Sequence, residues 1–293
     1  MVLSIITLNY KKVDLTLNCI KSLYAQFGEK FGNNTIELII VDNASGDDSV
    51  ETLNKTIHQE KYKNIHVSAN SENAGFGKGC NLGAKTAKGK YILFLNNDTI
   101  VKDRGIYDMV TFLEQHQEAA ILGGQLCNMD GSTQSSTGNF YTLPRVFMFL
   151  LGLQRYKLID NSPRTVSRVD WVKGGFFMIR ADVFHKLKGF DENIFMYTED
   201  MELCYRAAIA KYATYFYPHA KVLHVDQGSS NRTFAIINIY ENLLYFYKKH
   251  RSNNEYIFLK TLLKTKAIFL FAIGKIFKND YLSQTYEKAL KVS

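Results

Sequence analysis

The segment Ile36-Glu-Leu-Ile-Ile-Val-Asp-Asn-Ala-Ser-Gly-Asp-Asp48 joins an apolar run to a polar cluster, and a helical pattern follows it. Residues 36–41 are almost all apolar, as in a strand that is buried on both faces. The polar cluster at 42–48 ends that strand, and Leu53 and Ile57 then lie four residues apart, on one face of a helix. A strand that leads directly into a helix is the repeating unit of a parallel α/β sheet.

The same alternation extends from this segment in both directions. We expect further strands at 2–8, 64–68, 91–95, 120–126, 171–179, 214–217 and 221–225. We expect helices at 15–27, 75–87, 106–116, 181–187 and 199–210, and a helical, aromatic and basic region at 233–278. The pattern predicts an α/β fold with a doubly wound, mostly parallel sheet, helices on both faces and a C-terminal helical extension. The periodicity fails at 127–168, which we interpret as an insertion that covers the site or meets an acceptor.

The composition is that of a folded, basic protein. Of 293 residues, 46% are hydrophobic and 13% aromatic, which is enough for a substantial core and excludes wholesale disorder. The 36 Lys and Arg residues exceed the 28 Asp and Glu residues, which gives a net charge of +8. The four cysteines form no C-x-x-C pair, which argues against a zinc knuckle or a disulfide framework and fits a reducing compartment.

The sequence also indicates where the protein works. The first ten residues lack the basic region and cleavage site of a signal peptide, and no run reaches the roughly 18 apolar residues that span a bilayer. We therefore expect a cytoplasmic protein, either soluble or peripheral on the inner face of the cell membrane.

Three polar clusters follow directly after predicted strands, at 42–48, 70–75 and 96–98. Because the carboxyl ends of parallel strands meet at one edge of a sheet, these clusters should share one crevice. Ligands bind at that edge in open α/β sheets. The sequence therefore predicts a ligand site there.

Each cluster has a functional and a structural interpretation. The carboxylate of Asp42 is placed to accept a hydrogen bond from the imide of a uracil or thymine ring, but residues 42–45 also suit a helix cap. The Gly-rich stretch 70–81 matches neither the G-x-G-x-x-G fingerprint nor a Walker loop. Its glycines fit either backbone N–H groups at a phosphate or a tight contact between helix and sheet.

Later polar residues suggest a cation and a base. Asp98, after Asn96 and Asn97, suits a hard divalent cation, and an ordinary polar turn is the alternative. His224 suits a second ligand or a structural residue. Acidic residues at 198–202 fit the positive end of a helix dipole, but their apolar, Gly-rich flanks also suit a general base.

Taken in order, these clusters resemble the family 2 inverting glycosyltransferases of the GT-A fold, in particular the rhamnosyltransferase-like branch of bacterial surface-polysaccharide biosynthesis (O-antigen or capsule). The resemblance extends from about residue 4 to 249. It is carried by residues 5–10, 41–45, 72–76, 95–99, 171–175, 189–192 and 198–200, and by His224 with the Gly-Ser that follows.

The resemblance implies a role for each matching residue. The nucleoside and diphosphate would be bound by Thr7, Asn9, Asp42, Asn73, Asn81, Asn96 and Asn97. The pair Asp98 and His224 would hold Mn²⁺ or Mg²⁺, and Trp171, Gly174 and Gly175 would meet the acceptor. Catalysis would fall to the Thr-Glu-Asp motif, with Glu199 beside the base Asp200. Asn96 stands where the family usually has an acid, which leaves the diphosphate to neutralise most of the cation's charge.

The implied activity is inverting, metal-dependent transfer of a sugar. A single sugar would be added, because the Q-x-x-R-W motif of processive synthases is missing. The donor would be dTDP-L-rhamnose and the acceptor a polyprenyl-diphosphate-linked saccharide. A UDP-hexose or UDP-N-acetylhexosamine donor stays open. A non-catalytic nucleotide-sugar-binding scaffold subunit is the alternative from another class, but the intact Thr-Glu-Asp motif argues against it. We see no motif that reads nucleic acid.

The resemblance also divides the chain. Residues 1–126 would form the nucleotide-sugar-binding half of one GT-A domain and 127–232 its acceptor-binding, catalytic half, followed by a basic helical segment at 233–293. Within that segment, 255–278 has lysines among apolar and aromatic runs, as in a helix that lies on an anionic membrane. The alternatives are packing on the catalytic domain and a homodimer contact.

Overall fold

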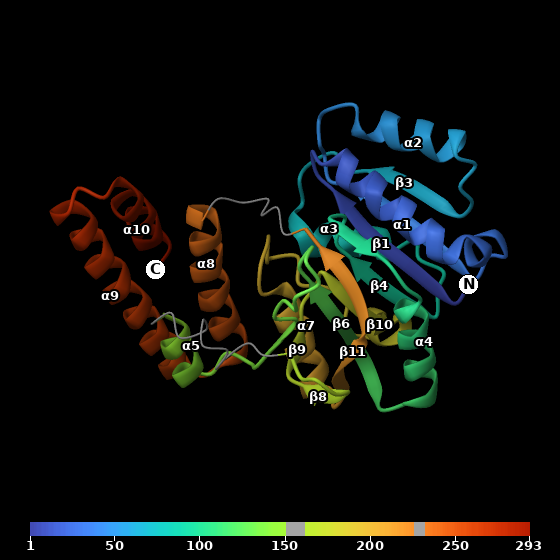
Figure 1. The fold of residues 1–293 in the computed structure, drawn as a ribbon. Helices are drawn as coiled ribbons and strands as arrows, with labels where there is room; N and C mark the ends of the chain where they lie inside the picture. The colour runs from blue at the N-terminus through green and yellow to red at the C-terminus, as the bar shows by residue number, and fades with distance from the viewer. Residues whose placement is uncertain (151–161, 226–231) are drawn as a thin grey trace.

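The computed structural model describes residues 1–150, 162–225 and 232–293. Within these ranges one sheet of nine strands forms the centre of the α/β part of the molecule (Figure 1). Its strands are β1 (Leu3–Asn9), β2 (Ile36–Asp42), β3 (Ile65–Ala69), β4 (Tyr91–Leu95), β5 (Thr99–Val101), β6 (Ala119–Cys127), β8 (Ser167–Val169), β10 (Phe176–Arg180) and β11 (Ala213–His224). Their order is β3-β2-β1-β4-β10-β6-β11-β5, and β8 pairs with β11. The short strands β7 (Thr137–Gly138) and β9 (Trp171–Val172) form a second sheet.

Helices cover both faces of the large sheet, as the sequence predicts. They are α1 (Val13–Gly32), α2 (Ser49–Gln59), α3 (Gly75–Ala84), α4 (Gly105–Gln115), α6 (Ala181–Lys186) and α7 (Glu199–Ile209). A further helix, α5 (Leu143–Leu150), lies away from the sheet, next to the C-terminal helical region (Figure 1). Successive side chains of a strand point to opposite faces. Thus Ile5 belongs to the core that includes Cys19 of α1, whereas Ile6 belongs to the core that includes Cys80 of α3. Both cores are apolar and almost fully buried.

The sheet is parallel on one side and mixed on the other. β3, β2, β1 and β4 are parallel, whereas β10 lies antiparallel between β4 and β6, and β5 and β8 are antiparallel to β11. The strand expected at 171–179 is interrupted, because a turn at 173–175 separates β9 from β10. The two strands expected at 214–217 and 221–225 are one strand, β11, with a register shift between Tyr217 and Lys221.

The C-terminal region is helical, as the sequence pattern predicts. α8 (Arg232–His250), α9 (Asn253–Ile276) and α10 (Asp280–Val292) pack together on one side of the sheet (Figure 1). The side chain of Ser252 accepts a hydrogen bond from the backbone of Glu255, and the Glu255 carboxylate accepts one from the backbone of Ser252. This capping box starts α9 and separates it from α8. In the described ranges, no helix has both the length and the apolar character that a membrane span needs.

Candidate functional site

A cavity of about 510 Å³ opens where β1 and β4 end, next to the turn at 173–175 and the start of α7. Most of the predicted site residues line it. They are Asn73, Asn96, Asn97, Asp98, Trp171, Gly174, Gly175, Glu199, Asp200 and His224. These positions are far apart in the chain, so the fold brings together clusters that the sequence presents separately.

Asp200 is held by the backbone on two sides. Its Oδ2 accepts a hydrogen bond from the N–H of Gly174 at 2.9 Å, and its Oδ1 accepts one from the N–H of Met201 at 2.7 Å. Burial raises the pKa of Asp200, while these hydrogen bonds and the charge of Lys173 oppose the rise. The carboxylate is therefore both desolvated and oriented, which suits a general base.

Glu199 lies beside Asp200 without a comparable set of partners. Its Oε2 is buried and makes no hydrogen bond within the described part of the chain. Burial, together with the neighbouring charge of Asp200, raises the pKa of Glu199 to about 8. Because two buried carboxylates rarely ionise together, we expect Glu199 to hold a proton at neutral pH while Asp200 is charged.

This proton makes stability depend on pH. Between about pH 4.5 and 8 the folded protein keeps a proton on Glu199 that the unfolded chain releases, so stability should fall as pH rises through that window. Glu199→Gln removes this dependence. The two stability curves should diverge by up to about 1.4 kcal/mol per pH unit, with the variant favoured at high pH. Urea unfolding between pH 5 and 9 measures this, with exposed Glu72→Gln as the control. Parallel curves would contradict a raised pKa.

The predicted metal ligands Asp98 and His224 lie together at the carboxyl end of β11. Oδ1 of Asp98 lies 3.2 Å from Nε2 of His224, is buried, and accepts no hydrogen bond from any described residue. The amide of Asn96 also reaches this point, with its nitrogen 3.3 Å from the same Nε2. An unpartnered carboxylate oxygen and an imidazole nitrogen at one point fit a divalent cation. In the described ranges, no group of three or more His, Cys, Asp or Glu side chains is placed to hold a metal.

Gln134 fixes the orientation of His224, and sequence reasoning did not identify it. The Gln134 Nε2 donates to Oδ1 of Asn128 at 2.8 Å and to the carbonyl of His224 at 3.2 Å. Its Oε1 therefore faces Nδ1 of His224, at 2.9 Å, and that nitrogen carries the hydrogen. The lone pair of a neutral ring then lies on Nε2, the nitrogen that faces Asp98.

The predicted nucleoside contacts Thr7, Asn9 and Asp42 are buried but are not among the residues that line the cavity. Thr7 donates to the carbonyl of Leu95 at 3.0 Å, and Asn9 donates to Asp42 at 2.7 Å. The Asp42 carboxylate also accepts hydrogen bonds from the backbone N–H and the hydroxyl of Ser45. Asp42 thus shapes the turn after β2 and does not cap α2, whose N-cap is Asp48.

Asn81 is engaged away from the cavity. Its amide donates to the carbonyl of Phe190 at 2.9 Å and accepts from the N–H of Phe190 at 2.9 Å. A contact from Asn81 to ribose or diphosphate would require these buried bonds to break.

The N-terminus of α3 is also occupied. The N–H groups of Ala74, Gly75 and Phe76 bond to Asn43, Asn73 and the carbonyl of Phe195. A Cβ atom at Gly75 would lie 2.1 Å from that carbonyl oxygen. The structure therefore favours close packing over phosphate binding for the glycines of this segment.

Other residues line the cavity that the sequence analysis did not select. Lys12 follows β1, and Lys173 belongs to the turn between β9 and β10. Both place positive charge where an anionic ligand would lie. Asn43 is buried and binds the loop at 70–75 through both ends of its amide. Its position directly after β2 is the feature of the sequence that could have identified it as a site residue. The Gly-Ser after His224 lies outside the described residues.

Comparisons with known proteins show which family this chain resembles. The family described as glycosyl transferase family 2 matches residues 4–187. The rhamnosyltransferase WbbL of Escherichia coli is 30% identical over 55% of this chain and 64% of its own length. The N-acetylglucosaminyl-diphospho-decaprenol L-rhamnosyltransferase of Mycobacterium tuberculosis is 25% identical over 67% of this chain and 69% of its own. The match thus leaves about a third of each relative's length uncovered.

A solved structure has the same fold. The mannosyltransferase PcManGT of Pyrobaculum calidifontis, in complex with GDP-Man and Mn²⁺, superposes with a TM-score of 0.60 at 14% identity. The match covers 99% of this chain and 74% of that chain. The predicted GT-A fold, with its C-terminal helical region, is thereby confirmed. Since the family match covers more than half of the residues, the chain belongs to glycosyl transferase family 2.

Proposed function

We propose that the protein transfers one L-rhamnosyl residue, with inversion, from dTDP-L-rhamnose to a lipid-linked saccharide during surface-polysaccharide assembly. The observation that carries the proposal is the backbone-anchored carboxylate of Asp200 in the same cavity as the pair Asp98 and His224. The choice of rhamnose and of a lipid-linked acceptor is supported by the names of the two relatives.

The chemistry needs one base and stabilisation of the leaving group. The acceptor hydroxyl attacks C1 of the sugar as the bond from C1 to the diphosphate breaks, and its proton passes to a carboxylate oxygen of Asp200. One displacement inverts the anomeric centre, so no protein nucleophile is required. Asp98 and His224 would hold a divalent cation, which when bound neutralises charge on the leaving diphosphate. Lys12 and Lys173 add positive charge to the same cavity.

The donor is tested by calorimetric titration with dTDP, UDP, GDP and CDP, each with and without Mn²⁺. Preferential, Mn²⁺-dependent binding of dTDP is the expected result, followed by release of dTDP from dTDP-L-rhamnose when a lipid-linked acceptor is added. A preference for UDP would replace the donor and keep the mechanism. Binding to none of the four nucleotides would contradict the proposal.

We also propose that α9 holds the enzyme on the inner face of the membrane, where a lipid-linked acceptor lies. One side of α9 packs on its neighbours through Leu259, Leu263 and Ala267. The outward side and the turn after the helix expose apolar and basic side chains together. These are Ile257, Phe258, Lys260, Lys264, Ile268, Phe269, Lys275, Ile276, Phe277 and Lys278. Such a mixture fits an anionic lipid surface.

Removing charge from this side should weaken membrane binding. The double change Lys264→Gln with Lys275→Gln is expected to reduce the affinity for phosphatidylglycerol vesicles by about 30-fold, at about 1 kcal/mol per lysine. Vesicle co-sedimentation measures the effect. Lys55→Gln with Lys85→Gln removes the same charge from exposed positions on α2 and next to α3, and should leave binding nearly unchanged. Equal losses in both double variants would contradict the assignment to α9.

A further inference from the structure

We infer that Asn242, on α8, positions the catalytic base by holding the strained backbone that leads into α7. The inference rests on the proposed function, because it concerns the step in which Asp200 takes the proton. Asn242 lies outside the part of the chain that the family match covers.

The backbone before Asp200 has an uncommon conformation. Tyr197 and Thr198 have φ angles of 71° and 68°, in the left-handed region, and neither is glycine. This region is unfavourable for side chains with a Cβ, and most of all for a β-branched residue such as Thr198. Two such residues in succession persist only where their surroundings hold them. Both line the cavity, and Glu199 and Asp200 follow immediately.

One side-chain amide binds this stretch. The Nδ2 of Asn242 donates to the carbonyl of Met196 at 2.8 Å and to the carbonyl of Tyr197 at 2.9 Å. Both hydrogens of the amide nitrogen are thus used on consecutive peptide groups, and only 5% of Asn242 is exposed. Thr198 then accepts the first hydrogen bond of α7, from the N–H of Glu202 at 2.8 Å. The direction in which the Asp200 side chain points from α7 therefore depends on the peptide groups that Asn242 binds.

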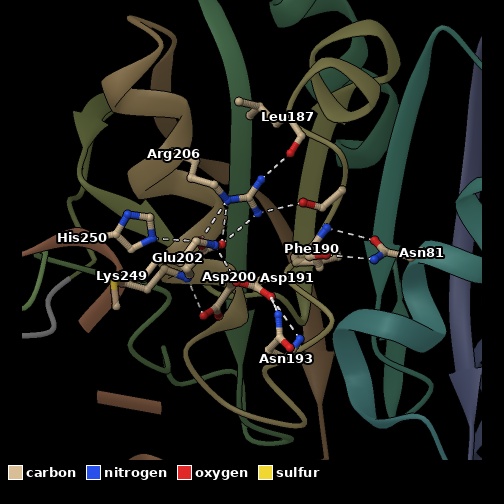
Figure 2. A network of polar contacts seen from close by, with 12 residues as sticks. Asn81, Leu187, Phe190, Asp191, Asn193, Asp200, Glu202, Arg206, Lys249 and His250 are labelled. Atoms are coloured by element: carbon tan, nitrogen blue, oxygen red, sulfur yellow. Dashed lines mark hydrogen bonds and ion pairs between the residues drawn. The ribbon is translucent and has the colours of Figure 1, made fainter. Parts of the chain in front are cut away.

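α8 is itself fixed firmly against α7. The carboxylate of Glu202 is fully buried and accepts hydrogen bonds from Arg206 of its own helix and from Lys249 and His250 of α8 (Figure 2). Lys249 also pairs with Asp191, at the start of the loop that ends in Thr198. Lys249 and His250 lie about two turns after Asn242. The side chain of Ile239, in the turn before it, lines the cavity. α8 is therefore a wall of the site and a support for the base.

The test compares two buried asparagines on the same helix. Asn238 lies one turn before Asn242, but its Nδ2 donates to the carbonyl of Phe234 within α8. Asn242→Ala and the similarly sized Asn242→Leu are expected to lower kcat by about 10-fold to 100-fold, as a misplaced catalytic group does. The KM for the donor should stay within about threefold, because ground-state binding is retained. Asn238→Ala should lower the melting temperature and leave kcat near the wild-type value.

A glycine background shows whether the strain matters. Glycine adopts a positive φ without steric cost, so Asn242→Ala should lower kcat less in a Thr198→Gly protein than in the wild type. An equal loss in both backgrounds would overturn the inference. So would equal losses of kcat in Asn238→Ala and Asn242→Ala.

Hydrogen exchange separates this inference from the proposed function. In Asn242→Ala, the amides at 199–204 should exchange faster than in Asn238→Ala, because the first turn of α7 loses its support. If the wild type transfers no sugar from any donor, the proposed function fails, and the exchange comparison alone decides the role of Asn242. Equal exchange rates in the two variants would overturn it.

Discussion

Asp200→Asn is expected to lower the turnover number by about 10²-fold to 10⁴-fold, the range that a positioned general base contributes. An amide cannot take the proton of the acceptor hydroxyl, yet it occupies almost the same volume. It keeps one of the two backbone hydrogen bonds, from Gly174 or Met201, and loses the other. Affinity for the nucleotide should hardly change, because the base acts on the acceptor and not on the diphosphate.

Steady-state kinetics and calorimetry on the same protein separate these effects. Asp182→Asn is a matched control, because Asp182 also lies in the first turn of a helix, α6, but is exposed. It should keep full activity. If Asp200→Asn loses nucleotide binding together with turnover, Asp200 does not act as the base.

Asp98→Ala is expected to weaken binding of dTDP in the presence of Mn²⁺ by at least about 10-fold to 100-fold, since the loss of groups that support a metal site has effects of that size. Without Mn²⁺ the same change should not weaken binding, because it removes a negative charge near an anionic ligand. The difference between the two titrations therefore reports the metal and not the fold.

The direct measurement is the affinity for Mn²⁺ itself, by electron paramagnetic resonance of the free ion. Asp108→Ala, an exposed aspartate on α4, is the control. Gln134→Leu should show a smaller loss in the same direction, because the ring of His224 is no longer held in one orientation. If Mn²⁺ does not change dTDP binding to the wild type, the assignment of Asp98 and His224 is wrong.

The alternation of apolar runs and polar clusters was enough to predict most strands and helices of the α/β sheet. Each run of apolar residues followed by a polar cluster, as at Asp42 and Asn96, became a strand whose end faces the site or its supporting layer. The short strand β5 was missed, because its three residues are too few to show a period. The division of 171–179 was also missed, since the turn at 173–175 is bound by distant residues. The N–H of Asn96 donates to the carbonyl of Gly175, and the carboxylate of Asp200 accepts from the N–H of Gly174.

The supporting residues of the site were beyond the reach of these patterns, because they act across long separations. Gln134 and His224 are 90 residues apart, and Asn242 and Met196 are 46 apart. No periodicity links such pairs. Asn81 shows the converse, because its place near a glycine-rich segment predicted a ligand contact, whereas in the structure its amide binds a distant peptide group.

The capping box at Ser252 has a consequence for protein engineering. The first turn of α9 is capped by its own residues. By contrast, α8 is bound to Glu202 of α7 through Lys249, and its Asn242 binds the backbone that leads into α7. A chimaera between this protein and a relative should therefore be joined between His250 and Ser252. A junction there exchanges α9 and α10 together. It keeps the carboxylates of Asp191 and Glu202 with Lys249, their partner on α8. A junction between the sheet and α8 would separate α8 from the helix α7 that it supports.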